Sequence, residues 1–421
     1  MSGEDVARTG AQPNATGRDR TVGARMAEGR RCLQAIGGPD YDGPLKKVAA
    51  VSPDMADLLL AFPYGDVMSR PGLSLRHRQI CTIAMLLAHR SAQAQLRFHM
   101  RGLLNVGGSI DDLVELLVIA SGLLGFPPAI AGVPIIRDLI AEQGIAYVPA
   151  EHQPAGAEER FDRGAQAFRT LLHVEPEAYA AAFAGISPAL AQWTVEFEFG
   201  DVLSRSGLDT ASRHLASLMM LAMRGNSEDR LLLHLRGALA DDVPRTAIVE
   251  ALIQLAVYGG FPTALTAFGI AAEAFAGPAA PAHDAPAAVA IGRAEPFDRA
   301  ARGLATLNAT SAGAGDAVVK SFAGVAPDIG AMIVDHAYGD IFARPGLDPK
   351  TRELTACAAL AAMGAVDEGP LGVHVSAART LGATEAEIIE TILNTAPYAG
   401  YPAAQQAIVV AHAAMRSADD K

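Results

Sequence analysis

Three copies of one pattern run through the 421-residue sequence, and this repetition constrains the fold more than any other feature. The cleanest copy spans Gly346–Pro402 and contains, in order, Arg352-Glu353, an apolar stretch, His374, Glu390 and a Tyr-Ala-Gly-Tyr-Pro ending. The same order occurs at Arg213-His214, His234, Glu250 and Tyr258, and at Arg78-Gln79, His99, Glu115 and Leu123. In all three copies the His-to-Glu interval is sixteen residues, so the chain is predicted to be a tandem triplication.

The composition favours an all-α fold for each copy. Half of the residues are hydrophobic but only 5% are aromatic, and the strong helix formers alanine and leucine supply most of the apolar surface. No stretch alternates convincingly between apolar and polar residues as a strand would. We therefore expect three tandem helical bundles.

Local composition predicts where these bundles begin and end. Residues 1–23 are polar and lack an apolar period, which is typical of a disordered arm. Pro/Ala-rich stretches predict linkers at 144–157 and 277–293. The predicted helical repeats are 24–143, 158–276 and 294–416.

Each repeat contains one helix that is apolar on nearly all of its faces. This helix is expected at about residues 76–88, 212–223 and 351–363. A helix without a polar face is normally surrounded by others. We therefore expect it to be the buried centre of its repeat.

Charge and cysteine content exclude several functional classes. The formal net charge of −12 argues against nucleic acid or an anionic membrane as the main partner. Cys32, Cys81 and Cys357 form no C-x-x-C motif and are interpreted as buried small hydrophobes. No signal peptide and no long apolar span is found. We expect a cytoplasmic protein without nucleic-acid or membrane partners.

The repeated motif also resembles a known family. The order Arg-Glu-Leu, His, Glu and a final Gly-[Phe/Tyr]-Pro is similar to the carboxymuconolactone decarboxylase family, whose relatives include thiol peroxidases called alkyl hydroperoxidase D. The resemblance covers residues 50–142, 185–276 and 324–416. The peroxidases carry cysteines seven and four positions before the equivalent histidine. Here those positions hold no cysteine, which excludes thiol peroxidase chemistry: they are Ala92, Gln95, Ser227, Arg230, Asp367 and Pro370.

The recurring histidine is the leading candidate for chemistry, because imidazole exchanges protons near neutral pH. A ring packed in the core is the structural alternative. In the family, the position after the recurring arginine is usually a glutamate near the histidine, able to act as acid or base. The candidate catalytic residues are Glu353, His374 and Tyr398 in the third copy, His214, His234 and Tyr258 in the second, and His99 in the first.

The copies differ in how many of these polar positions they retain. Only the third keeps the glutamate, although one extra residue separates Glu353 from His374 and leaves their geometry open. The first copy has Gln79 and Leu123 at the other two positions, so repeat 1 is predicted to be a scaffold.

The recurring arginines Arg78, Arg213 and Arg352 are candidates for binding a substrate carboxylate through paired hydrogen bonds. The alternative is a structural ion pair with a recurring aspartate, which is Asp66, Asp201 or Asp340. The structural alternative is slightly favoured.

Metal binding is a further alternative. The histidines follow no short ligand spacing, so a site requires convergence of several repeats. The set would be His99, His214, His234, His336 and His374. Some relatives in aromatic polyketide pathways look like non-haem iron enzymes that cleave quinone rings. Iron is the cofactor that this alternative requires, and otherwise no cofactor is expected.

The resemblance predicts a carboxymuconolactone decarboxylase-like lyase that acts on a small oxygenated or carboxylated organic substrate, in secondary metabolism, by histidine acid/base chemistry. The alternatives are the iron-dependent ring-cleaving oxygenase and a non-catalytic binding or assembly protein. Family members usually form rings of six small subunits. Three fused copies make half of such a ring, so we expect a homodimer that forms a pseudo-hexamer.

Overall fold

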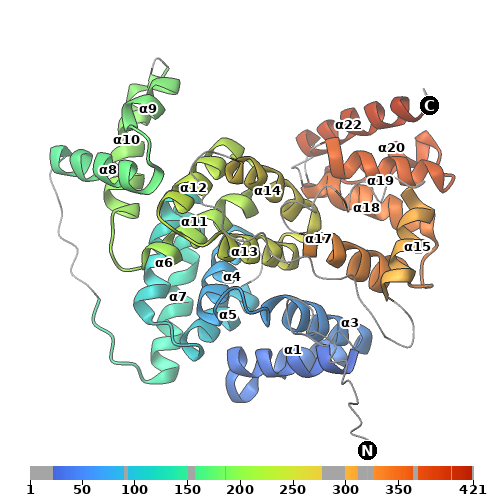
Figure 1. The fold of residues 1–421 in the computed structure, drawn as a ribbon, viewed down its shortest axis with the longest axis horizontal. Coiled ribbons are helices and arrows are strands. Elements are labelled where there is room, and N and C mark those ends of the chain that lie inside the picture. The colour runs from blue at the N-terminus through green and yellow to red at the C-terminus, as the bar shows by residue number, and fades with distance from the viewer. Residues whose placement is uncertain are drawn as a thin grey trace, which may run out of the picture.

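The computed structural model describes residues 22–89, 93–149, 157–184, 186–276, 299–311, 320, 327–363, 368–399 and 401–419. All regular elements in these ranges are helical, so the predicted all-α fold is confirmed. The three repeats follow one another from blue through green to red in Figure 1. The predicted arm at 1–23 falls almost wholly, and the predicted linker at 277–293 wholly, outside the described residues.

The repeats share one succession of helices, which includes a π-helix that sequence patterns did not predict. Repeat 1 comprises α1 (Val22–Gly37), η1 (Gly38–Asp40), α2 (Gly43–Ala49), α3 (Pro53–Leu59), the π-helix η2 (Leu60–Met68), α4 (Leu75–His89), α5 (Gln93–Asn105), α6 (Ile110–Leu123) and α7 (Phe126–Gln143). Repeat 2 comprises α8 (Ala157–Leu172), α9 (Pro176–Ala184), α10 (Pro188–Trp193), the π-helix η3 (Thr194–Leu203), α11 (Thr210–Arg224), α12 (Glu228–Ala240), α13 (Arg245–Tyr258) and α14 (Gly260–Phe275).

Repeat 3 comprises α15 (Arg299–Ser311), α17 (Pro327–Met332), the π-helix η4 (Ile333–Phe342), α18 (Pro349–Met363), α19 (Glu368–Thr380), α20 (Glu385–Leu393), α21 (Ala396–Ala399) and α22 (Tyr401–Asp419). Its last helix continues beyond the predicted end of the repeat at residue 416.

Glycine allows the leading helix of each repeat to cross its π-helix at close range. A Cβ atom on Gly29 of α1 would overlap the carbonyl oxygen of Leu60 and lie 3.1 Å from the amide nitrogen of Gly65. The same overlap would occur at Gly164 with Val195 and at Gly303 with Val334. The crossing therefore requires glycine in every copy.

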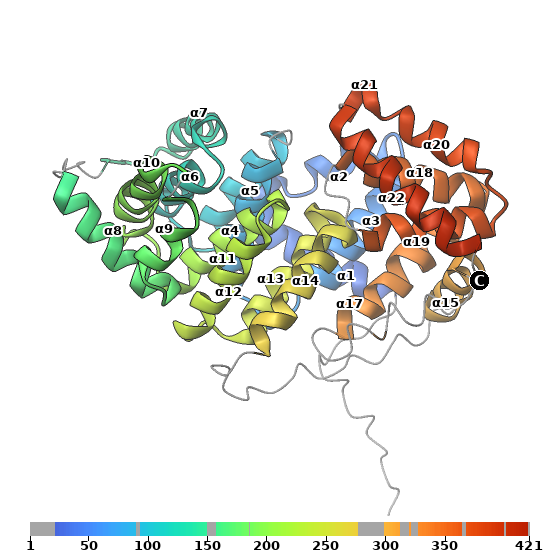
Figure 2. The same ribbon diagram turned by 90° about the horizontal axis from the view of Figure 1, so that it is seen from above.

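Repeats 1 and 2 are interlocked, and repeat 3 lies to one side of them. One hydrophobic core runs continuously through the first two repeats, with α4 and α11 packed along each other. Repeat 3 has a separate core of its own. It occupies the right-hand end of the molecule in both Figure 1 and Figure 2.

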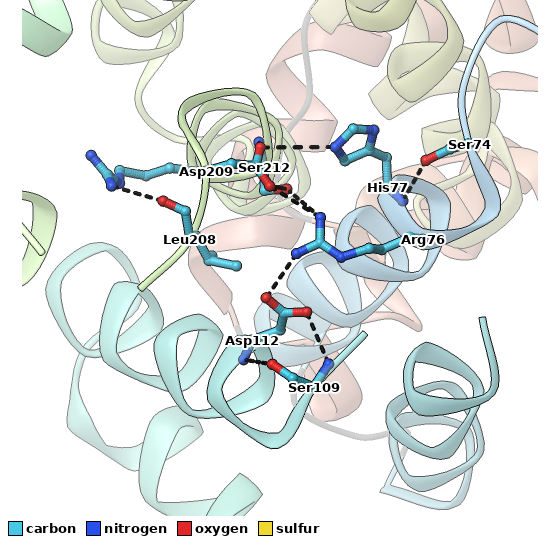
Figure 3. Close-up of polar contacts among 9 residues, drawn as sticks. Ser74, Arg76, His77, Ser109, Asp112, Leu208, Asp209 and Ser212 are labelled. Atoms are coloured by element: carbon cyan, nitrogen blue, oxygen red, sulfur yellow. Dashed lines mark hydrogen bonds and ion pairs between the residues drawn. The ribbon is translucent and has the colours of Figure 1, made fainter. Parts of the chain in front are cut away.

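A polar cluster joins the first turns of α4 and α11. Arg76 donates to the Asp209 carboxylate at 3.0 Å and to the Asp112 carboxylate at 2.8 Å. Asp209 also caps α11 by accepting from the Ser212 amide. Figure 3 shows the Arg76 guanidinium between the two carboxylates, one from each repeat.

Two arginine–glutamate contacts, one buried and one partly buried, connect the same repeats reciprocally. Arg70 of repeat 1 donates to Glu250 of repeat 2 at 2.8–2.9 Å, and Arg205 of repeat 2 donates to Glu115 of repeat 1 at 2.5–3.0 Å. These residues occupy equivalent positions in the two copies. The exchange is therefore that of a two-fold dimer built within one chain.

The apolar central helix differs in the third repeat. In α4 and α11 it is buried as predicted, with Met85 and Met220 fully covered. In α18 the equivalent Ala359 is exposed, and so is Thr355 one turn earlier. The prediction of a buried centre is therefore wrong for α18, because no other repeat covers it as α4 and α11 cover each other.

None of the described helices is both long and apolar enough to cross a membrane.

Candidate active sites

The first candidate site, the repeat 1 site, is assembled from two repeats. Gln79 of α4 and His99 of α5 meet through Oε1 and Nδ1, which are 2.8 Å apart. The other ring nitrogen of His99, Nε2, lies 3.3 Å from the hydroxyl of Tyr258, at the end of α13 in repeat 2. The repeat order groups Tyr258 with His214 and His234, but the structure places it across the interface instead.

Burial determines the charge of this site. Removal of water from His99 lowers its pKa to about 3, so the ring is neutral at physiological pH. Burial also raises the pKa of Tyr258, which keeps the phenol protonated. The repeat 1 site is thus an uncharged Gln–His–Tyr chain of hydrogen bonds. Repeat 1 thus retains a chain of polar side chains, and its role as a scaffold stays a prediction.

The equivalent repeat 2 site has lost its hydrogen-bond chain. His214 Nε2 lies 2.8 Å from Asp241, which also contacts His173 at 3.0 Å. His234 is buried, and its Nε2 has no hydrogen-bond partner. Burial, and then the positive charge of Arg230, holds the pKa of His234 well below its usual value. The residue of repeat 1 at the position equivalent to Tyr258 is Leu123, which carries no phenol.

The repeat 3 site pairs a carboxylate with an imidazole. Glu353 Oε2 of α18 lies 2.6 Å from His374 Nδ1 of α19, so the extra residue between them does not prevent their contact. Glu353 is fully buried and its Oε1 has no hydrogen-bond partner, whereas the His374 side chain is 19% exposed. The repeat 3 site therefore has a carboxylate–imidazole pair in which the histidine reaches solvent, whereas in the His214–Asp241 pair of repeat 2 the histidine is buried and the aspartate reaches solvent.

Buried neighbours of Glu353 stay uncharged. Burial, reinforced by the negative charge of Glu353, raises the pKa of the Cys357 thiol to about 12. The same two causes raise the pKa of Tyr338. Cys357 is therefore an inert thiol, as predicted, and Glu353 and His374 are the paired polar side chains of this site. The side chain of Tyr398 lies outside what the structure describes.

The recurring arginines make structural contacts, but with partners other than the predicted aspartates. Arg78 is fully buried and donates to Glu250 at 2.7 Å and to the Arg70 carbonyl at 3.0 Å. Arg213 donates to the Leu208 carbonyl, and Arg352 to the Arg344 carbonyl. The contacts of all three favour the structural interpretation over substrate binding.

The predicted aspartates pair with the leading helices. Asp66 binds Arg25, Asp201 binds Arg160 and Arg163, and Asp340 lies 3.8 Å from Arg302. They hold the leading helices against the π-helices.

The histidines proposed as iron ligands do not converge. His99, His374 and the pair His214 and His234 belong to three separate sites, and His336 stacks on Phe62 with ring centroids 3.8 Å apart. Within the described ranges, no three His, Cys, Asp or Glu side chains are grouped as metal ligands would be. The histidine geometry therefore does not favour the oxygenase alternative.

One recurring feature that supports these sites was missed in the sequence. The feature is a four-residue turn that recurs in each copy, as Arg70-Pro71-Gly72-Leu73, Arg205-Ser206-Gly207-Leu208 and Arg344-Pro345-Gly346-Leu347. In repeats 1 and 2 the arginine of this turn binds the glutamate of the facing repeat, eight residues before the position of Tyr258 or Leu123. The exact recurrence of Arg, Gly and Leu was the available signal.

Comparison with known proteins agrees with the repeat organisation. The family model described as "Carboxymuconolactone decarboxylase family" matches residues 53–138, 188–273 and 327–413, together more than half of the chain. The chain is 31% identical over 113 residues to the 4-carboxymuconolactone decarboxylase of Acinetobacter baylyi, which covers 27% of this chain and 84% of that protein.

Two further relatives match shorter stretches. An uncharacterized 15.0 kDa protein of Paracoccus denitrificans is 37% identical over 95 residues, or 23% of this chain and 71% of the relative. The nitrosuccinic acid decarboxylase of Metarhizium robertsii is 36% identical over 90 residues, or 21% of this chain and 62% of the relative.

Proposed function

The chain belongs to the carboxymuconolactone decarboxylase family, and from this premise we propose that it is a decarboxylase-like lyase that uses Glu353 and His374 to move a proton. The observation that carries the proposal is the 2.6 Å contact between the buried Glu353 carboxylate and the partly exposed His374 ring. Two of the three relatives described above are named as decarboxylases, which supports the reaction class.

The proposed reaction breaks the bond between a carboxylate group and the adjacent carbon. The electron pair of that bond stays on the carbon and spreads onto a neighbouring carbonyl, lactone or nitro oxygen, while CO2 leaves. A proton must then reach the carbon. A group that donates a proton or a hydrogen bond as this charge develops lowers the barrier.

In the repeat 3 site, His374 is the proposed donor. The Glu353 carboxylate beside Nδ1 balances the positive charge of a doubly protonated ring and orients it. Nε2–H then faces the substrate and gives its proton to the carbanion, and solvent reprotonates the ring. A second proton donor from a phenol, as Tyr258 supplies to the repeat 1 site, would stabilise the enolate oxygen.

The repeat 1 site is chemically different because an amide replaces the carboxylate. Gln79 cannot balance a charged imidazole, and His99 is held neutral by burial. We therefore assign turnover to the repeat 3 site. The repeat 1 site is an example of a site in which the phenol comes from the facing repeat.

The proposed substrate is a small, oxygenated organic acid, and the mechanism uses no cofactor. Fusion and divergence of three copies support a specialised substrate, such as a secondary metabolite. Both 4-carboxymuconolactone and nitrosuccinic acid carry a carboxylate whose loss places charge beside an electron-withdrawing group. These two compounds are therefore the probes of choice.

The test is CO2 release from each probe by the wild-type protein and by His374→Ala, with His412→Ala on the exposed face of α22 as the control. The proposal predicts a loss of about 10²- to 10⁴-fold for His374→Ala and none for His412→Ala. Equal turnover by His374→Ala and wild type, or no CO2 release from either probe, would contradict it.

A further inference from the structure

Repeat 3 carries the equivalents of the residues that join repeats 1 and 2, and no described repeat faces them as repeats 1 and 2 face each other. We propose that the surface formed by α18, α20 and the Arg344–Leu347 turn binds the same surface of a second copy of the chain. The resulting two-fold pair would repeat the reciprocal arginine–glutamate exchange of repeats 1 and 2 and complete the Glu353–His374 site. Only its catalytic consequence rests on the proposed function.

The glycine of the recurring turn lies beside a space that a glutamate fills in repeats 1 and 2 and that is open in repeat 3. We call this space the socket. In repeat 1 a Cβ atom on Gly72 would lie 2.7 Å from Cγ of Glu250, and in repeat 2 a Cβ on Gly207 would overlap the side chain of Glu115. Both glycines thus make room for a glutamate from the facing repeat. Around Gly346 no atom lies within 4 Å of the same position. None of the described residues fills, in repeat 3, the space that the glutamate fills in repeats 1 and 2.

The leucine next to this glycine leads to the same conclusion. Leu73 and Leu208 are 6% and 3% exposed, because the facing repeat covers them. The equivalent Leu347 is 49% exposed. A second copy would bury this apolar side chain, as happens within the chain at the other two positions.

The charges on this surface are self-complementary. Arg344 is equivalent to Arg70 and Arg205, and Glu390 is equivalent to Glu250 and Glu115. Arg352 donates to the Arg344 carbonyl at 2.7 Å, as Arg78 does to the Arg70 carbonyl at 3.0 Å, so the arginine pair is already arranged.

In the single chain, however, the glutamate of the exchange is exposed on α20. Arg344 binds Asp54 of repeat 1 through side chains that are 45% and 64% exposed. An exposed pair of this kind is weak enough to be exchanged for a buried one. A two-fold axis would place each Arg344 opposite the Glu390 of the other copy.

The helix between these charges is uncovered. Thr351, Leu354, Thr355 and Ala358 of α18 and Thr391 and Asn394 of α20 line an open groove of about 490 Å3. Asn394 is equivalent to Gln254, which crosses the repeat 1–repeat 2 interface to donate to the Arg78 carbonyl at 2.8 Å. The small side chains of α18 allow a second α18 to approach closely.

This pairing has a consequence for the active site. In the repeat 1 site the phenol comes from the facing repeat, at the position that Tyr398 occupies in repeat 3. A second copy would therefore supply Tyr398 to the Glu353–His374 pair. The two-fold pair would complete the repeat 3 site in the way that repeat 2 completes the repeat 1 site.

Charge exchange tests the interface directly. Light scattering after size exclusion should give twice the 43.7 kDa chain mass for the wild type. Arg344→Glu and Glu390→Arg should each give the single-chain mass, because like charges then face each other. The double variant Arg344→Glu/Glu390→Arg should regain the double mass. A wild type that remains at 43.7 kDa, or a double variant that remains dissociated, would overturn the proposal.

Gly346→Val tests the socket without altering charge. In the single chain the new side chain enters open space, so the thermal unfolding of the single chain should be unchanged, whereas the dimer should dissociate at least tenfold more readily. Gly269→Val, where likewise nothing lies within 4 Å, is the control and should keep the double mass. A Gly346→Val dimer as tight as the wild type would contradict the socket. These masses do not depend on turnover. If the masses are as predicted but no CO2 is released, only the proposed function is contradicted.

Discussion

The hydroxyl of Tyr258 lies 3.3 Å from Nε2 of His99, although 159 positions and a repeat boundary separate the two residues. Their contact shows that the repeat 1 site takes its side chains from two repeats. The histidine and its first partner come from one repeat, and the phenol comes from the repeat that faces it.

Tyr258→Phe should destabilise the chain by about 1 kcal/mol, because it removes a buried hydrogen bond and leaves His99 Nε2 without a donor. Urea unfolding measures the change. Tyr147→Phe, in the loop after α7, is the control and should change stability by less than about 0.5 kcal/mol. Equal effects of the two substitutions would indicate that the Tyr258–His99 contact contributes nothing.

Glu250→Ala should lower the free energy of unfolding by about 3–5 kcal/mol, because it leaves Arg70 and Arg78 buried without a counter-charge. The matched control is Glu142→Ala, which removes an exposed partner of Arg97 and Arg101 and should cost at most about 1 kcal/mol. If both variants unfolded at the same urea concentration, the buried exchange would not be what holds repeats 1 and 2 together.

Acid should weaken the fold through His99. The folded pKa of His99 is about 3, below its ordinary value of 6.5, so the unfolded chain binds one more proton between these values. Stability is therefore fully present above about pH 6.5 and falls by up to about 1.4 kcal/mol per pH unit below it. His99→Asn should reduce this slope by about one proton in urea unfolding at pH 5, 6 and 7. An unchanged slope would mean that His99 is already charged in the fold.

Substituting the side chain that contacts Nδ1 of the histidine should change the acid/base chemistry of both the repeat 3 site and the repeat 1 site. Glu353→Gln makes the repeat 3 site resemble the Gln79–His99 pair and should reduce CO2 release by at least about tenfold. Gln79→Glu places a carboxylate beside His99, which should raise the pKa of His99 and flatten the pH dependence of stability. NMR titration of the two histidines would check both changes. Full activity of Glu353→Gln would remove the carboxylate from the mechanism.

Helical periodicity and repeat spacing were sufficient to predict the all-α fold, the three repeats and the polar positions of each site. The pairing of residues between repeats was not predictable from the order of the copies. Tyr258 follows His234 at a constant interval in the sequence, yet it lies beside His99. A tandem repeat has the same sequence pattern whether each copy forms its own site or contributes side chains to the site of a neighbouring copy.

Composition was similarly insufficient for the central helices. The helices α4, α11 and α18 are all largely apolar, so the same pattern predicted that each would be buried. Only the threonines and alanines of α18, in place of residues such as Met219 and Met220 of α11, hinted that this helix has a different environment within the chain.

Complementation between inactive chains tests most directly whether the catalytic site is assembled across an interface. His374→Ala and Tyr398→Phe chains would be mixed in equal amounts after dissociation, and CO2 release from the responsive probe would be measured. In a two-fold pair, half of the dimers are mixed and half of their sites carry both intact residues, so the mixture should recover about a quarter of wild-type activity. A mixture no more active than the average of the two separate variants would contradict the account.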